Sequence, residues 1–264
     1  MDKKFTLGII GAGNMASAIV GGILNSGLLS PDMLLISDLD DEKLDVFAKK
    51  HLAVTKDNLY LSSSCENLLF AVKPQCAPQI LTEIKSTVTA NLIISIMAGV
   101  SIDKLQGYLG NRNYARIMPN TPALIGEGMA AVAFSKNFRS PFVIDIFKSL
   151  GKVVELDETL FDAVTSLSGS GPAYVYLFIK ALIDGGIEGG LSADDAKTLA
   201  IQTVIGSAKM VSASNKPIDQ LIDAVCSKGG TTIQAVDSFK QDGLEEIVKR
   251  GIEKCRNRSK ELGK

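Results

Sequence analysis

A glycine turn between an apolar strand and a helix is the feature that most constrains this chain. Residues 5–10 read FTLGII, an apolar run of strand length, and lead without a polar linker into GAGNMA at residues 11–16. In such a turn the first glycine permits the bend, the second lets the backbone approach a pyrophosphate, and a small third residue, here Ala16, allows close packing of strand and helix. The pyrophosphate then lies at the helix N-terminus. The pattern predicts dinucleotide binding, and its alternative is a glycine-lined helix start without a ligand.

Ser37 and Asp38 follow the next apolar segment, residues 34–36, where a dinucleotide-binding fold reads the adenosine ribose. The Ser37 hydroxyl can donate to a phosphate. A carboxylate at Asp38 instead accepts hydrogen bonds from free ribose hydroxyls and repels a 2′-phosphate. We therefore predict that NADH is used at least as well as NADPH. The alternative role of Asp38 is the N-cap of a helix predicted over residues 41–50.

Further apolar segments of strand length alternate with helical patterns up to about residue 158. Strands are predicted at 67–72, 92–96, 115–122, 129–134 and 152–155, and helices at 77–86, 101–109 and 141–150, whereas the polar residues 51–66 predict no element. This alternation predicts a parallel, doubly wound sheet that binds ligands at the carboxyl ends of its strands. Residues 72–74 and 97–99 are two such ends.

Beyond residue 158 the chain is predicted to be helical. A helix over 158–167 is expected to stop at the glycine-rich residues 168–172, and a long apolar helix follows to about 187. Ser192 and Asp195 begin another helix in the manner of a capping box, Pro217 opens the next, and the last covers about 243–262. Because the long helix carries few charges, it needs partners on several faces, which predicts an interleaved dimer. A monomeric helical bundle is the alternative.

Two glycines and two threonines precede another helix in CSKGGTTI at residues 226–233. The free N–H groups and the dipole at the start of such a helix favour an anion. The segment is therefore a candidate carboxylate site. A well-capped helix start without a ligand is the alternative.

Composition argues against several classes of function. The formal net charge is −1, which leaves no basic face for nucleic acid or an anionic membrane. The four cysteines show no C-x-x-C spacing and His51 is the only histidine, so we predict no metal site and no histidine-dependent hydrolase. The chemistry must then come from a cofactor. The first predicted strand begins at residue 5, and the apolar runs are too short to span a membrane. A cytoplasmic location is therefore expected.

Six motifs in order along the chain resemble the pyrroline-5-carboxylate reductase family: GAGNM (11–15), AVKP (71–74), AGV (98–100), MPNTPA (118–123), SGSGPAY (168–174) and GGTTI (229–233). The resemblance implies reduction of the cyclic imine 1-pyrroline-5-carboxylate to L-proline by NADPH or NADH. It also implies a Rossmann-like domain over residues 1–158 and a helical substrate-binding and dimerisation domain over 159–264. A homodimer through the C-terminal helices, assembled further into a ring such as a decamer of dimers, is implied as well.

The resemblance also assigns roles to residues. The expected cofactor contacts, with Ser37 and Asp38 included, are Gly11, Ala12, Gly13, Asn14, Met15, Ser37, Asp38, Asn58, Ala71, Val72, Lys73, Pro74, Met97, Ala98 and Gly99. The expected substrate contacts are Ser170, Gly230, Thr231 and Thr232, with Thr232 as the catalytic residue that hydrogen-bonds the ring nitrogen. Lys228 departs from the family pattern, which has proline there, and Lys180 stands where an acidic residue is usual.

Hydride transfer to a protonated imine needs alignment of donor and acceptor and a proton source, and it needs no strong side-chain acid. That chemistry suits a threonine-lined site without histidine. Two other functions are weighed against it. One is a β-hydroxyacid dehydrogenase, whose catalytic lysine would be Lys180 after Gly169 and Gly171, and the other is a dinucleotide-binding regulatory subunit without turnover.

Overall fold

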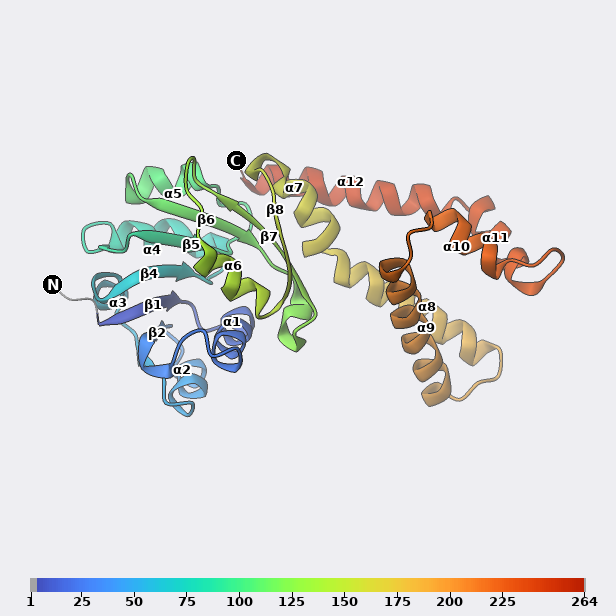
Figure 1. Cartoon of the computed structure of the whole chain (residues 1–264), viewed down its shortest axis with the longest axis horizontal. Coiled ribbons are helices and arrows are strands. Elements are labelled where there is room, and N and C mark those ends of the chain that lie inside the picture. The colour runs from blue at the N-terminus through green and yellow to red at the C-terminus, as the bar shows by residue number, and fades with distance from the viewer. Residues whose placement is uncertain (1–3, 264) are drawn as a thin grey trace. The chain divides into compact units, whose positions relative to one another are not determined.

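The computed structural model describes residues 4–263 and contains an eight-stranded sheet in the order β3-β2-β1-β4-β5-β6-β7-β8 (Figure 1). The strands are β1 (Phe5–Ile10), β2 (Leu34–Ser37), β3 (Ala53–Thr55), β4 (Cys65–Phe70), β5 (Leu92–Ser95), β6 (Asn113–Met118), β7 (Gly128–Phe134) and β8 (Gly151–Glu155). Neighbouring strands are parallel except β6 and β7, which are antiparallel. The predicted doubly wound, mostly parallel sheet is confirmed.

Helices cover both faces of the sheet. One face packs against α1 (Asn14–Asn25), α2 (Asp41–Ala48) and α6 (Pro141–Lys148), and the other against α3 (Asn58–Ser64), α4 (Ala77–Ile84) and α5 (Ile102–Leu109). Successive strand residues point to opposite faces, so Ile94 joins the first cluster and Ile93 the second. Short helical turns complete this part of the chain: η1 (Pro31–Met33), η2 (Pro74–Cys76), η3 (Thr121–Ile125) and η4 (Glu158–Leu160).

Residues 51–66, for which no element was predicted, form β3, α3 and the start of β4. The Asp57 side chain caps α3 by accepting from the N–H groups of Leu59 and Tyr60. Helix α3 ends at Ser64, so strand β4 begins at Cys65 and spans 65–70 instead of 67–72. The expected cofactor residues Ala71 and Val72 lie just beyond the end of this strand. The predicted strand over 115–122 ends at Met118, because Pro119 interrupts it and η3 follows.

The glycine-rich segment 168–172 does not end the preceding helix as predicted. Helix α7 (Phe161–Val164) continues into the π-helical turn η5 (Thr165–Gly169), and α8 (Gly171–Glu188) begins directly after Ser170. The Ser170 N–H donates to the Thr165 carbonyl at 2.9 Å, which closes the wider turn. A Cβ at position 169 would lie 2.5 Å from Met118 Cε, so this glycine serves close packing against β6.

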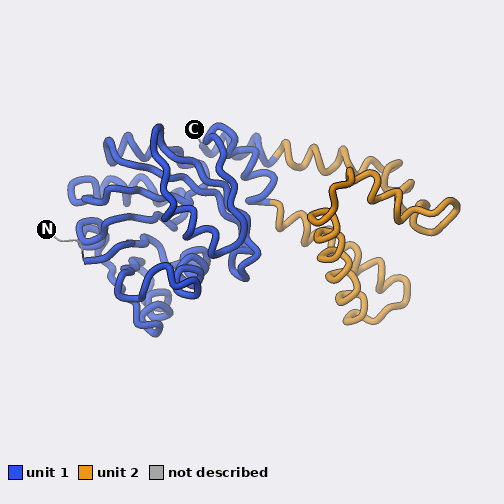
Figure 2. The backbone as a smooth tube through the Cα atoms, in the orientation of Figure 1, with its two compact units in different colours: residues 1–170, 255–264 blue, residues 171–254 orange. Residues whose placement is uncertain are grey.

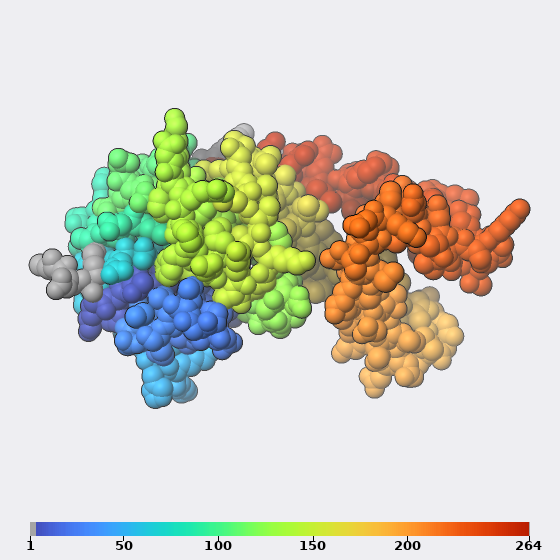
Figure 3. Space-filling model, in the orientation of Figure 1, coloured from blue at the N-terminus to red at the C-terminus, as the bar shows by residue number. Residues whose placement is uncertain are grey.

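The chain divides into two compact units, residues 1–170 with 255–264 and residues 171–254 (Figure 2). In the space-filling view, residues 4–170 of the first unit, coloured blue to yellow, form a closely packed body (Figure 3). The second unit contains α8, α9 (Ala193–Ala213), α10 (Ile218–Val225), α11 (Thr231–Gln241) and most of α12 (Leu244–Gly263). Within residues 4–263, no helix is long and apolar enough to span a membrane.

The predicted capping box of α9 is present in modified form. Ser192 Oγ accepts from the Asp195 N–H at 3.1 Å, and its hydroxyl also lies 2.7 Å from Asp195 Oδ2. The Asp195 carboxylate thus contacts the cap hydroxyl instead of the cap backbone, because an aspartate is shorter than the usual glutamate.

Candidate functional site

The glycine turn lies where the carboxyl ends of β1, β2 and β4 meet. The Gly11 N–H donates to the Ser37 carbonyl at 2.7 Å, and the Ala71 N–H donates to the Ile10 carbonyl at 2.8 Å. Gly11 has a φ of 103°, and a Cβ there would lie 2.7 Å from the Ala71 carbonyl oxygen. Only glycine satisfies both conditions. The strand order reverses direction between β1 and β4, so the turn is at the topological switch point of the sheet.

Among residues 4–263, no contact requires a glycine at position 13. It has φ −79° and is the N-cap of α1, and a Cβ built on it would meet nothing within 4 Å. No side chain of residues 4–263 caps this helix start, so its first N–H groups are available to an external acceptor. Ala16 is fully buried in the close strand–helix contact. An open backbone surface beside free N–H groups suits a pyrophosphate.

Asp38 faces the glycine turn. Its Oδ2 accepts from the Ala12 N–H at 2.8 Å and its Oδ1 from the Asp40 N–H at 3.1 Å. The alternative prediction that Asp38 caps α2 is wrong, because the N-cap is Asp40, whose side chain accepts from the N–H groups of Glu42 and Lys43. Asp38 thus keeps a carboxylate at the end of β2, beside the turn that is expected to hold the cofactor.

Ser37 and Asn58 interact with each other. Ser37 is fully buried, and its hydroxyl donates to Asn58 Oδ1 at 2.8 Å. The Asn58 amide donates in turn to Glu83 Oε2 at 3.2 Å. The Ser37 hydroxyl already donates its proton to Asn58, so this geometry gives no support to a phosphate contact by Ser37. Asn58, by contrast, is fixed beside the end of β2.

The remaining expected cofactor residues follow two adjacent strands. Ala71, Val72, Lys73 and Pro74 follow β4, and Met97, Ala98 and Gly99 follow β5. Lys73 and Ala98 are exposed, whereas Met97 is buried. A cavity of about 500 Å³ between α4 and α5 is lined by Pro74, Ala98 and Gly99, and also by Leu262 from the end of α12.

Ser170 lies at the end of the π-helical turn η5. The Cys255 thiol donates to Ser170 Oγ at 3.3 Å. The MPNTPA motif supports the same turn, since the Asn120 amide donates to the Ser168 carbonyl at 3.3 Å and Asn120 Oδ1 accepts from the Met129 N–H at 2.9 Å. π-helical turns of this kind are frequent at functional sites.

The threonine segment begins α11 in the second unit. Gly229 has a φ of 72°, Gly230 is the N-cap, and no side chain of the described chain caps the helix. Thr231 is exposed and Thr232 is half-buried. Free N–H groups, the positive end of the helix dipole and two threonines therefore occur together at this end of α11, which suits a carboxylate. Lys228 is exposed two residues before the cap and adds a positive charge.

His51 and Lys180 each take part in local structure. The chain leaves α2 through His51, which has a φ of 62°. Lys180 is on the exposed surface of α8 and forms an i,i+4 ion pair with Asp184 at 2.5 Å. This pairing gives Lys180 a structural role and does not favour its use as a dehydrogenase lysine.

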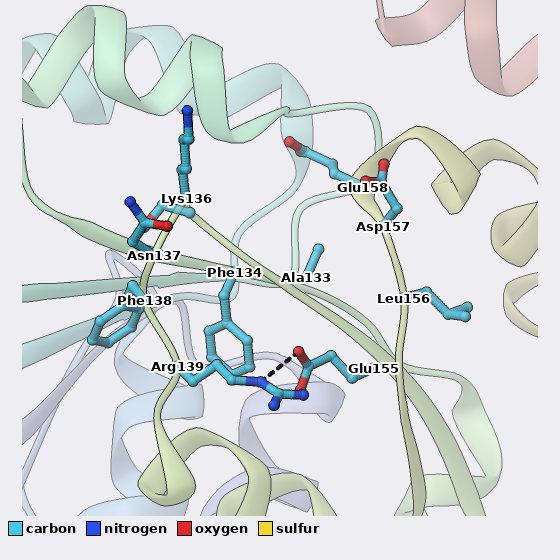
Figure 4. A pocket seen from close by; sticks show the side chains of 11 residues that line it. Ala133, Phe134, Lys136, Asn137, Phe138, Arg139, Glu155, Leu156, Asp157 and Glu158 are labelled. Carbon is cyan, nitrogen blue, oxygen red and sulfur yellow. Dashed lines mark hydrogen bonds and ion pairs between the residues drawn. The ribbon is translucent and has the colours of Figure 1, made fainter.

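A second hollow, of about 780 Å³, lies at the carboxyl ends of β7 and β8 (Figure 4). Because β7 is antiparallel to β6, these ends are at the edge of the sheet opposite the glycine turn. Arg139 and Glu155 bridge the hollow with two contacts of 2.7 and 2.6 Å (Figure 4). Glu158 at its rim accepts from Arg116 at 2.9 Å and from the Ile102 N–H at 2.8 Å. None of the predicted site residues lines this hollow.

Three contacts at the site were missed by the sequence reasoning: Asp38 with the Ala12 N–H, Ser37 with Asn58, and Cys255 with Ser170. Their partners are 26, 21 and 85 residues apart in sequence, respectively. The strand ends signalled the region of the first contact, but nothing in the sequence pattern linked the other two pairs.

A doubly wound sheet with an uncapped glycine turn at its switch point defines the class of Rossmann-type dinucleotide-binding proteins. A family model described as pyrroline-5-carboxylate reductase dimerisation matches residues 158–262, and one described as NADP oxidoreductase, coenzyme F420-dependent, matches residues 6–99.

Curated relatives and solved structures agree with these models. A pyrroline-5-carboxylate reductase of Pisum sativum is 35% identical, covering 99% of this chain and 97% of its own length, and one of Synechocystis sp. is 38% identical, covering 98% of each. The structure of the Plasmodium falciparum pyrroline carboxylate reductase with NADP bound has a TM-score of 0.90 and 35% identity over the whole of both chains. The chain therefore belongs to the pyrroline-5-carboxylate reductase family.

Proposed function

We propose that this protein reduces 1-pyrroline-5-carboxylate to L-proline with NADH or NADPH, the last step of proline biosynthesis. The observation that carries the proposal is the presence of two uncapped, glycine-preceded helix starts, at Asn14 and at Thr231, in a chain of this family. The first suits a dinucleotide pyrophosphate and the second a substrate carboxylate.

The proposal assigns the cofactor to residues 1–158 and the substrate and the subunit contacts to residues 159–264. The glycine turn, Asp38 and Asn58 would hold the adenosine and pyrophosphate half. Residues 71–74 and 97–99 would line the nicotinamide half, because they follow the two strands beside β1 on that side of the sheet.

When bound, the reduced nicotinamide supplies a hydride to the imine carbon, and the ring nitrogen keeps its proton as the positive charge is neutralised. The N–H groups at the start of α11 would bind the substrate carboxylate, and Thr232 would hydrogen-bond the ring nitrogen. These groups orient the imine, which is the main requirement of the reaction. The Thr231 hydroxyl can add a hydrogen bond to this carboxylate, and we propose that Ser170 also contacts the substrate.

The assembly and the location are also part of the proposal. The match of residues 158–262 to a dimerisation model supports a homodimer through the C-terminal helices. Following the resemblance, we propose that the dimers assemble further into a ring such as a decamer of dimers. No disulfide joins the cysteines of residues 4–263, which suits the proposed cytoplasmic location.

Oxidation of NADH or NADPH tests the proposed function, with absorbance at 340 nm as the readout. The purified protein should oxidise the cofactor in the presence of 1-pyrroline-5-carboxylate and form proline. It should not do so with a β-keto acid or with no second substrate. Turnover of the keto acid alone would indicate a β-hydroxyacid dehydrogenase, and cofactor binding without any turnover would indicate a regulatory subunit.

A further inference from the structure

The end of α12 returns to the first unit and contacts two segments of the proposed site. Residues 255–263, here called the C-terminal clamp, group with residues 1–170 and not with the rest of α12. The clamp is anchored by Ser259, whose hydroxyl donates to Asp162 Oδ1 of α7 at 2.6 Å. This contact joins residues 97 positions apart and fixes the helix next to the π-helical turn.

One end of the clamp acts on Ser170. The Cys255 thiol donates to Ser170 Oγ at 3.3 Å. A serine hydroxyl has one proton, and an oxygen that accepts from the thiol keeps that proton free to donate elsewhere. Cys255 therefore leaves the Ser170 hydroxyl as a donor, which is the role that a substrate anion needs.

The other end of the clamp acts on the loop after β5. A Cβ at Gly99 would lie 3.2 Å from the Leu262 carbonyl oxygen, so the loop and the last turn of α12 are packed backbone against backbone. The Lys104 ammonium donates to the Gly263 carbonyl, and a cation at this place favours the C-terminus of a helix. Ser101 Oγ in turn accepts from the Lys104 N–H, which ties this contact to the start of α5.

We propose that the C-terminal clamp positions two walls of the reaction site, with Cys255 orienting Ser170 toward the substrate and residues 262–263 holding the 97–99 loop against the nicotinamide half of the cofactor. Cys255 and Lys104 are thus positioning residues. The inference rests on the proposed function, because it takes the roles of Ser170 and of the loop from it.

Steady-state kinetics of the full-length protein can separate the two ends of the clamp. We expect Cys255→Ala to raise KM for the imine by about 3- to 10-fold, the effect of one neutral hydrogen bond, with KM for the cofactor unchanged. Cys255→Ser keeps a donor and should restore the imine KM. Lys104→Met should raise KM for the cofactor instead, whereas Lys85→Met, at an exposed lysine after α4, should change neither value.

Several outcomes would overturn the proposal: an unchanged imine KM in Cys255→Ala, no rescue by serine, or equal rises in both KM values. Melting temperatures show whether a variant has unfolded. KM values are then compared only among the folded variants, with Cys255→Ser and Lys85→Met as the controls. If the wild type does not reduce the imine, the proposed function fails. Titration of NADH fluorescence still tests the clamp in that case, since Lys104→Met should weaken NADH binding and an unchanged affinity would refute the clamp.

Discussion

At the scale of single residues, Asp38 has a structural role, and we propose that it also selects the cofactor. Its carboxylate accepts from the Ala12 N–H of the glycine turn and lies at the end of β2. Lys43 offers little compensation, because its ammonium is 3.1 Å from Asp40 and 4.0 Å from Asp38. A 2′-phosphate placed here would meet a like charge, whereas a free ribose hydroxyl would meet an acceptor.

Substitution of Asp38 by asparagine should therefore shift the cofactor preference. The asparagine oxygen can still accept from Ala12, so the turn should persist while the charge is lost. We expect the wild type to use NADH at least as well as NADPH, and Asp38→Asn to shift the ratio of kcat/KM toward NADPH by about tenfold. Asp41→Asn, which removes an exposed carboxylate from the first turn of α2, is the control. A strong wild-type preference for NADPH that Asp38→Asn leaves unaltered would show that Asp38 does not face the ribose.

Thr232 is the residue on which the proposed substrate geometry depends most. Thr232→Ala should lower kcat/KM for the imine by about 10- to 1000-fold, since one or two oriented hydrogen bonds of about 1.5 to 3 kcal/mol are lost. Cofactor affinity should hold, and Thr232→Ser should retain most of the activity. The measurement is steady-state kinetics together with NADH titration. A Thr232→Ala protein with wild-type kcat/KM would remove this residue from the site.

The sequence pattern located the strand end at which Ser37 and Asp38 lie, but it did not identify the groups that their side chains contact. Asp38 was expected either to read the ribose or to cap α2, and only the backbone path of residues 38–41 decides that Asp40 is the cap. Ser37 meets Asn58 through α3, a helix that the polar residues 51–66 did not indicate. Such contacts depend on tertiary geometry that no local period encodes.

At the scale of elements, the two glycines of the turn are needed for different reasons. Gly11→Ala should destabilise the protein by about 1 to 3 kcal/mol, because position 11 has positive φ and no room for a Cβ. Gly13→Ala should leave the melting temperature unchanged, because its Cβ meets nothing within 4 Å. It should still weaken cofactor binding by about tenfold or more, since a methyl group would occupy the approach of the pyrophosphate.

Thermal unfolding and NADH titration of both variants measure these effects. Equal cofactor affinity in Gly13→Ala and the wild type would mean that no phosphate approaches this backbone. A fall in melting temperature in Gly13→Ala would mean that the glycine is required by the fold itself.

The cap of α2 predicts a pH dependence. The hydrogen bond from Lys43 lowers the pKa of Asp40 below its ordinary value of 3.8. A carboxyl whose pKa is lower in the folded chain contributes stability that is present above 3.8 and is lost as the pH falls through the lowered pKa. Asp40→Asn should thus melt slightly below the wild type at pH 7, and the difference should vanish in acid. A difference that persists at pH 2 would contradict this account.

The glycine-rich segment 168–172 shows why helix boundaries were the weakest part of the sequence prediction. Glycine and serine have low helix propensity, which predicted a stop. Contacts with β6 and with Asn120 override that preference and keep the chain helical through η5. The strongly apolar segments, by contrast, were predicted close to their observed bounds, because burial on both faces leaves such segments few alternatives.

At the scale of the whole molecule, the helices of the second unit bury little of their apolar surface within a single chain. Helix α8 has no buried residue within the chain as described, and four consecutive apolar side chains, Val175, Tyr176, Leu177 and Phe178, are 45 to 71% exposed. Consecutive residues point in different directions around a helix, so more than one face needs cover. The scarcity of charges in this helix was enough to predict from the sequence that a second chain covers it. The sequence does not indicate how many chains the assembly contains.

A charge on this helix should therefore weaken the proposed dimer. Leu177 is 71% exposed in the single chain, and burying a glutamate in its place against a second copy would leave a carboxylate unpaired. We expect the full-length wild type to sediment as a dimer or a larger assembly, and Leu177→Glu to shift the distribution toward the monomer at micromolar concentration. Leu39→Glu changes a leucine that is 80% exposed in the first unit and should sediment like the wild type. A wild type that sediments as a stable monomer, or a Leu177→Glu protein with unchanged sedimentation, would mean that α8 is not covered by a second copy of this chain.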